Sequence, residues 1–64
     1  MKQTPSEVVI ELFGIRPLAR MLGVAPITVL RWKKAGQIPS DHHLDLIEMA
    51  GGKLTADDLV FGRE

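Results

Sequence analysis

The chain has 64 residues, no cysteine and a formal net charge of zero. A domain of this length buries only about 60% of the surface of its unfolded chain, and without cysteine no disulfide or cysteine-based zinc site reinforces it. The longest apolar run near the start, Val8–Ile10, is too short to cross a bilayer and lacks a signal-peptide pattern. We therefore expect one cytoplasmic domain over residues 1–64, with an ordered core of about residues 5–61.

A capping box predicts the start of the first helix. The Thr4 hydroxyl can accept from the amide of Glu7, whose carboxylate can reach back to the backbone of Thr4, and Pro5 suits the first helical position. Gly14 is expected to end this helix. The apolar face that it would bury holds Val8, Val9, Leu12 and Phe13.

Residues 17–34 predict two short helices joined by a glycine turn. The first begins near Arg16 and ends at Gly23, where a left-handed residue can close a helix without a Cβ penalty. Pro26 marks the first position of the next helix, which is expected to run over residues 26–35. The apolar side chains that would hold this pair in the core are Leu18, Ala19, Leu22, Val24, Val29 and Trp32.

The spacing within this stretch is that of a helix-turn-helix: the small Ala19 stands four positions before Gly23, and Val24, Val29 and Trp32 follow. The stretch resembles the DNA-binding domains of Cro-like and lambda-repressor-like regulators, in particular small Cro-like and YdaS-like proteins of phages and prophages. In that family the first helix of the motif crosses the phosphate backbone and the second enters the major groove. The sequence departs from the family at Ala25, where Ser or Thr usually caps the second helix.

The remaining chain predicts an all-α fold, a compact bundle of four helices plus a short C-terminal helical turn. Ser40 is expected to cap a helix over residues 41–50, which Gly51 and Gly52 stop. Thr55 opens a second capping-box-like start. On the fourth helix the expected buried arc holds Leu44, Leu46, Ile47 and Ala50 around His43, and Leu54 and Leu59 are expected to pin the last turn to the core.

The charge is segregated along the chain. Residues 12–40 contain five basic side chains and no acidic one, whereas the rest contains three basic and eight acidic side chains. A basic stretch of this kind is often only a solvated helix surface. Because it coincides with the helix-turn-helix spacing, we interpret it as a surface for nucleic acid.

The recognition-helix candidate comprises residues 26–35. Because each residue of an α-helix is rotated by about 100° from the one before, one face of this helix is expected to point outward. The resemblance implies that the side chains on this face meet the edges of the bases. Arg31 could donate twice to guanine, and Lys34 could reach a base or a phosphate. The aliphatic Ile27 and Leu30 would contact thymine methyl groups, or would instead mark a protein contact or extra core. The expected base-facing residues are Ile27, Leu30, Arg31 and Lys34, and the expected phosphate contacts are Arg16, Arg20, Thr28 and Lys33.

Other residues that could carry chemistry have simpler structural interpretations. Trp32 is spaced from Val29 as a core residue, not as a stacking platform. The adjacent His42 and His43 would diverge by about 100° on a helix and are poorly placed to share a metal ion. We expect His43 to be a core histidine bonded to backbone. Without a glycine-rich phosphate loop, an HExxH motif or a cysteine nucleophile, we expect no enzyme activity, no cofactor and no small-molecule ligand.

These features predict a sequence-specific DNA-binding transcriptional regulator. The resemblance implies a Cro-like phage or prophage repressor that binds double-stranded operator DNA as a homodimer, formed either free or only on DNA. Leu54, Val60 and Phe61 are the expected dimer surface. The alternative is a protein-interaction or antitoxin-like module that keeps the scaffold without sequence-specific DNA binding, and the apolar Ile27 and Leu30 favour it.

Overall fold

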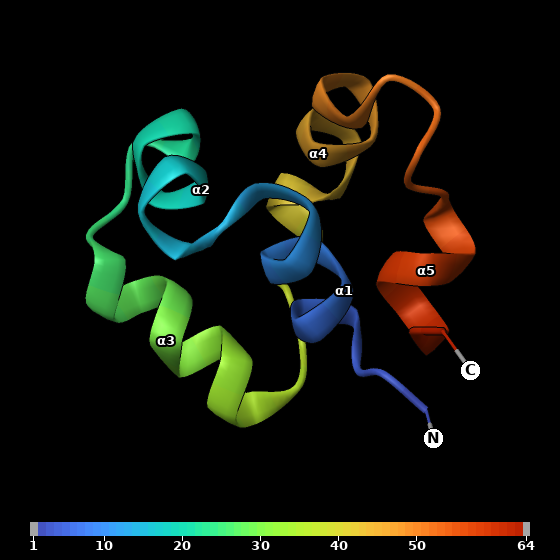
Figure 1. Ribbon diagram of the computed structural model, residues 1–64, viewed down its shortest axis with the longest axis horizontal. Coiled ribbons are helices and arrows are strands. Elements are labelled where there is room, and N and C mark those ends of the chain that lie inside the picture. The colour runs from blue at the N-terminus through green and yellow to red at the C-terminus, as the bar shows by residue number, and fades with distance from the viewer. Residues whose placement is uncertain (1, 64) are drawn as a thin grey trace.

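Five α-helices and one 3₁₀ turn follow one another through short connections in the computed structural model, which describes residues 2–63 (Figure 1). Their bounds are α1 (Pro5–Phe13), α2 (Ile15–Leu22), α3 (Pro26–Ala35), η1 (Ser40–His42), α4 (His43–Ala50) and α5 (Ala56–Phe61). The prediction of an all-α fold is confirmed for these residues, in which the one pairing of extended backbone is a bridge between Gln3 and Arg63. Residues 1 and 64 of the predicted domain lie outside the described part.

Two capping boxes fix the helix starts that the sequence predicts. The Thr4 hydroxyl accepts from the Glu7 amide at 3.3 Å, and the Glu7 carboxylate accepts from the Thr4 amide at 3.0 Å. Thr55 and Asp58 make the same pair of bonds, at 3.2 and 3.1 Å. Each cap is worth about 1 kcal/mol. The second box opens α5, a full α-helix where only a helical turn was expected.

A single cluster of buried aliphatic side chains holds all five helices. α1 lies at its centre and contacts α2, α3 and α5 (Figure 1). Ser6 is the buried polar residue of this region, and its hydroxyl lies 3.2 Å from the Thr4 hydroxyl, so it is not left unsatisfied. The buried aliphatic residues are Val8, Val9, Leu18, Ala19, Val29, Ile38, Leu46, Leu54 and Leu59.

The fourth helical segment differs from its prediction in two ways. Ser40 makes no side-chain cap and is itself the first residue of η1. The α-helix therefore starts at His43, and not at residue 41 as predicted. Leu44 is 68% exposed and does not belong to the buried arc. Because Leu44 and Leu46 are two positions apart, they lie about 200° from each other around the helix, and the burial of Leu46 leaves Leu44 on the exposed side.

Three smaller expectations are also corrected. α2 starts directly at Ile15, with Gly14 as both the end of α1 and the start of α2. Leu12 was expected to be buried but is 36% exposed. Leu54 is buried, as expected of a core residue, and therefore cannot also belong to a free dimer surface.

The two ends of the described chain are joined side by side (Figure 1). Gln3 and Arg63 exchange both backbone hydrogen bonds, and the Arg63 guanidinium donates to the Lys53 carbonyl and, at 2.8 Å, to the Asp58 carboxylate. The Arg63 bond, followed by the bond from the Thr55 backbone, lowers the pKa of Asp58 to about 2. We call this set of contacts the terminal clasp.

Gly62 lets the two backbones of the terminal clasp approach each other. Its φ of +78° favours glycine, and a Cβ there would overlap the carbonyl oxygen of Gln3. Gly23 has a similar φ of +70°, but a Cβ there would meet nothing within 4 Å. We expect Gly62→Ala to lower the free energy of unfolding by about 2–3 kcal/mol and Gly23→Ala by about 1 kcal/mol. Urea unfolding monitored by circular dichroism measures both, and equal losses would contradict the close approach.

Asp58 also makes the stability of the fold depend on pH. Because its pKa is lowered from 3.8 to about 2, its contribution is complete above about pH 4 and is lost as the pH falls toward 2. We expect wild type to be more stable than Asp58→Asn at pH 7 and the difference to vanish near pH 2, as measured by urea midpoints. The exposed neighbour substitution Asp57→Asn is the control, and a difference between wild type and Asp58→Asn that stays constant with pH would contradict the assignment.

Candidate nucleic-acid interface

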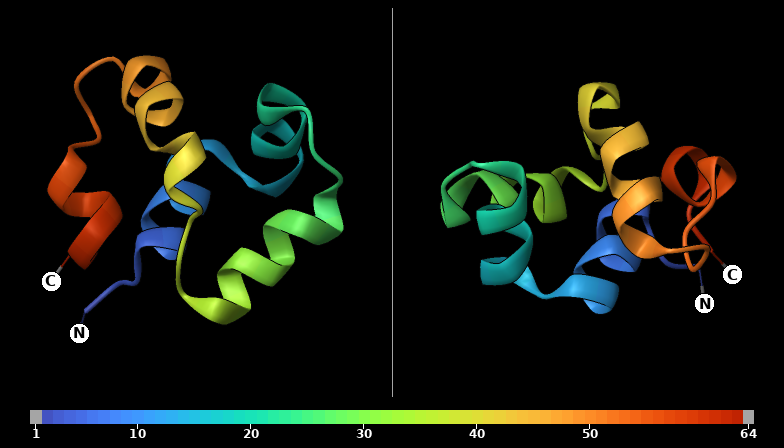
Figure 2. Two further views of the ribbon diagram at one scale, coloured as in Figure 1. Left: turned by 180° about the vertical axis from the view of Figure 1, so that it is seen from behind. Right: turned by 90° about the horizontal axis from the view of Figure 1, so that it is seen from above.

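α2 and α3 pack against each other through a three-residue turn at Gly23–Ala25 (Figure 2). The glycine adopts a left-handed conformation, with φ 70° and ψ 31°, and the Val24 amide donates to the Ala19 carbonyl at 2.9 Å. Ala19 is 2% exposed, and its small side chain permits close packing at the turn. Leu18 and Val29, both fully buried, complete the contact with the core. The predicted turn and helix bounds are therefore confirmed, apart from the start of α2.

The outward face of α3 carries the four side chains predicted to face bases. Ile27 is 55% exposed and Leu30 is 42% exposed, and both Arg31 and Lys34 are exposed as well. All four lie about 100° or more around the helix from the buried Val29. Ile27 and Leu30 are therefore not extra core, which removes one of the two alternatives for them.

The N-terminal turn of α3 is poor in hydrogen-bonding side chains. Ala25 is the N-cap and makes no side-chain bond, and Pro26 has no amide hydrogen. The Thr28 amide donates to the Ala25 carbonyl at 2.9 Å, and its side chain is only partly exposed. Exposed hydrogen-bonding side chains on the outward face therefore begin one turn later, at Arg31.

Within residues 2–63, no basic side chain of α2 or α3 forms an ion pair with a carboxylate. Among the described residues the one ion pair within 4 Å joins Arg63 to Asp58, in the terminal clasp. The exposed cations between α2 and the end of α3 face solvent, where their charge can attract an anion. Three of them also lie in the last turns of their helices, where a cation stabilises the helix dipole. The exposed cations of α2 and α3 are Arg16, Arg20, Arg31, Lys33 and Lys34.

Lys33 is set apart from the other cations of α3. The pKa of Glu7 is lowered chiefly by the bond from the Thr4 backbone and then by the Thr4 hydroxyl, with an additional contribution from the charge of Lys33. Lys33 is therefore close enough to Glu7 for its charge to act on that carboxylate. Arg16 and Arg20 lie one turn apart on the exposed side of α2.

Trp32 and the two histidines form a structural cluster beside the end of α3. The rings of Trp32 and His42 have centroids 5.2 Å apart and are inclined at 44°. The His43 Nε2 lies 2.8 Å from the Ile38 carbonyl oxygen, so the expected backbone bond is confirmed. Trp32 is partly buried and packs against the core. No group of three or more His, Cys, Asp or Glu within residues 2–63 is placed to hold a metal ion.

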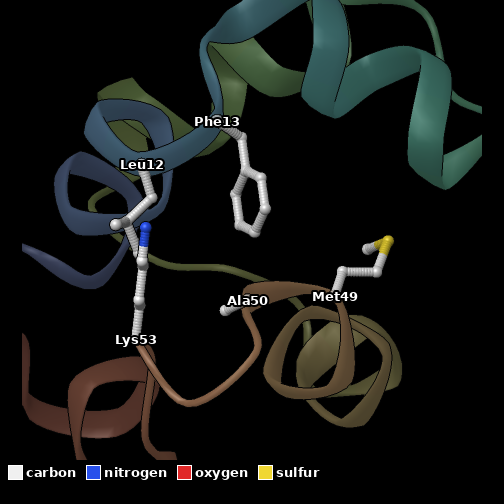
Figure 3. Close-up of a pocket in the computed structure, with 5 residues that line it drawn as sticks. All are labelled: Leu12, Phe13, Met49, Ala50 and Lys53. Atoms are coloured by element: carbon white, nitrogen blue, oxygen red, sulfur yellow. The ribbon is translucent and has the colours of Figure 1, made fainter.

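A hollow of about 170 Å³ lies between the end of α1 and the α4–α5 connection (Figure 3). Phe13 points from α1 into this space, and Leu12 and Met49, each just over one-third exposed, stand at its sides. Ala50 and Lys53 complete the lining. The prediction missed this feature because Leu12 was assigned to the core. Its lining consists of four apolar residues and one cation.

Comparison of the chain with protein-family models, with curated proteins and with solved structures finds no match. The resemblance to Cro-like regulators therefore rests on the spacing within residues 17–34. None of the helices in the described part of the chain has the length and apolar character needed to span a membrane.

The uncapped start of α3 can be tested directly. Ala25 has φ −72° and ψ 147°, the extended conformation typical of an N-cap. We expect Ala25→Ser to raise the free energy of unfolding by about 1 kcal/mol, because the hydroxyl can accept from an unpaired amide of the first turn. Thr55→Ala, which removes an existing cap, should lower it by a similar amount. Urea unfolding measures both variants, and no gain in Ala25→Ser would mean that the amides of this turn are already satisfied.

Proposed function

We propose that this chain is a sequence-specific DNA-binding transcriptional regulator, with α2, the turn and α3 acting as a helix-turn-helix. One observation carries the proposal: α2 and α3 together present five exposed basic side chains, none of which forms an ion pair within residues 2–63, on a chain whose net charge is zero. A positive surface of this kind attracts the phosphates of a duplex and releases their counterions.

In this proposal α3 enters the major groove with its outward face toward the bases. Arg31 donates two hydrogen bonds to a guanine, and Lys34 contacts a base or a phosphate near the edge of the groove. Ile27 and Leu30 make apolar contacts with base edges. The phosphate contacts come from Arg16, Arg20, Thr28 and Lys33.

The protein would act as a Cro-like repressor in the cytoplasm, by occupying operator DNA and blocking transcription. A homodimer on DNA would place its two α3 helices in successive major grooves, about 34–36 Å apart. Val60 and Phe61 on α5, which are 60% and 63% exposed, are the candidate dimer contacts. Leu54 has no part in this surface because it is buried.

The second candidate is a protein-interaction or antitoxin-like module on the same scaffold. The exposed fractions of Ile27 and Leu30, 55% and 42%, favour it because large aliphatic side chains on a surface often mark a protein contact. The surrounding cations would then need an acidic partner. Binding to duplex DNA at low salt separates the two candidates.

Arg31 and Arg20 should differ in their effect on DNA binding. We expect Arg31→Ala to cost about 1–3 kcal/mol on the preferred duplex and to relax specificity at one base pair. Arg20→Ala should weaken specific and random duplexes alike and reduce the salt dependence of log K by about one unit of slope. Fluorescence anisotropy with a duplex obtained by selection, titrated over a range of salt concentrations, measures both effects.

The matched control is Lys53→Ala, which removes one cation far from α3, beside the hollow at the end of α1. It should leave DNA affinity nearly unchanged. Failure of the wild-type protein to bind any duplex at low salt would overturn the proposed function. Binding that hardly responds to salt would overturn the phosphate contacts.

A further inference from the structure

The outward face of α3 has a polarity gradient along the helix axis. Its N-terminal half carries the aliphatic side chains Ile27 and Leu30, and its C-terminal half carries the cations Arg31 and Lys34. Each aliphatic residue precedes a cation by four positions, so two apolar-to-basic pairs, Ile27 with Arg31 and Leu30 with Lys34, run side by side along one face.

The apolar half has no polar side chain on its face with which to read a base. Ala25 supplies no cap, Pro26 has no amide hydrogen, and the Thr28 amide is already bonded to the Ala25 carbonyl. An exposed Ile or Leu can gain free energy in the major groove by covering an apolar group, and the 5-methyl group of thymine is the apolar group that the base pairs present there.

We propose that Ile27 and Leu30 make the DNA half-site depend on the methyl groups of two thymines, beside the base pair that Arg31 reads. This inference rests on the proposed function and names the bases that the same site recognises. The Cβ atoms of residues three positions apart on a helix lie about 5–6 Å from each other. At about 3.4 Å per base pair, the two thymines lie one or two steps apart.

The charges around the two aliphatic side chains favour this occupant over a second copy of the chain. A two-fold contact through the outward face of α3 would bring Arg31 and Lys34 of each copy toward the same residues of the other. Residues 12–40 contain no acidic side chain that could offset this repulsion. The phosphates that flank a major groove do offset it.

Deoxyuridine provides a direct test, because it differs from thymidine only by the missing methyl group. The experiment takes a duplex obtained by selection from random sequence and replaces each thymine in turn. We expect about a fourfold loss of affinity at two positions in each half-site, the value for one buried methyl group. The other thymines should be indifferent to the replacement.

Variants assign each thymine to its side chain. Ile27→Ala should abolish the deoxyuridine effect at one position and Leu30→Ala at the other. Met21→Ala is the matched control: Met21 is 43% exposed, close to the value for Leu30, but lies on α2. It should retain both effects. All three side chains are exposed, and urea unfolding checks that the variants fold like wild type.

The outcomes distinguish this inference from the proposed function. A duplex that is preferred over random DNA, yet insensitive to deoxyuridine at every position, overturns the methyl contacts and leaves DNA recognition standing. A deoxyuridine effect that persists in both Ile27→Ala and Leu30→Ala also overturns them. Loss of a dimer in these variants by sedimentation would assign the two side chains to a protein contact. Absence of any duplex preference overturns both proposals.

Discussion

The burial of one small aliphatic cluster is the constraint on which this molecule depends. Each helix contributes one or two buried aliphatic side chains, and α1, with Val8 and Val9, lies between the others. Residues 2–63 contain no second buried cluster that could compensate for a cavity in the first. The helices themselves are six to ten residues long, too short to be stable alone in water. The position of α3 therefore depends on contacts made by residues far from its own surface.

The acidic and basic residues of the chain do different work. Glu7 and Asp58 accept hydrogen bonds at the starts of α1 and α5, and Asp58 also holds Arg63, so these carboxylates take part in the fold. The cations of α2 and α3 hold no carboxylate in the described residues. A neutral formal charge thus hides an uneven distribution, in which the exposed cations of α2 and α3 are available to an external anion.

Features that depend on neighbours within four residues were predictable from the sequence. The Thr4 and Thr55 boxes, the left-handed Gly23 and the outward face of α3 follow from local bonding and helical geometry. Leu44 and Leu12 were placed wrongly because helical spacing gives the width of an apolar arc but not which edge of it meets the core. The terminal clasp was missed because Gln3 and Arg63 are 60 positions apart. For the site, the sequence could predict exposure and charge but not that Lys33 lies toward Glu7.

The terminal clasp has a consequence for how the chain can be connected to other polypeptides. Figures 1 and 2 both show the two ends side by side, on the opposite side of the molecule from α2 and α3. Anything fused to either end would emerge away from the basic surface and leave it uncovered. A linker of a few residues could also join the ends into a ring, in which the chain could be reopened at an exposed connection such as Gly51–Gly52. A chain reopened in this way would have its helices in a different order along the sequence but in the same arrangement in space.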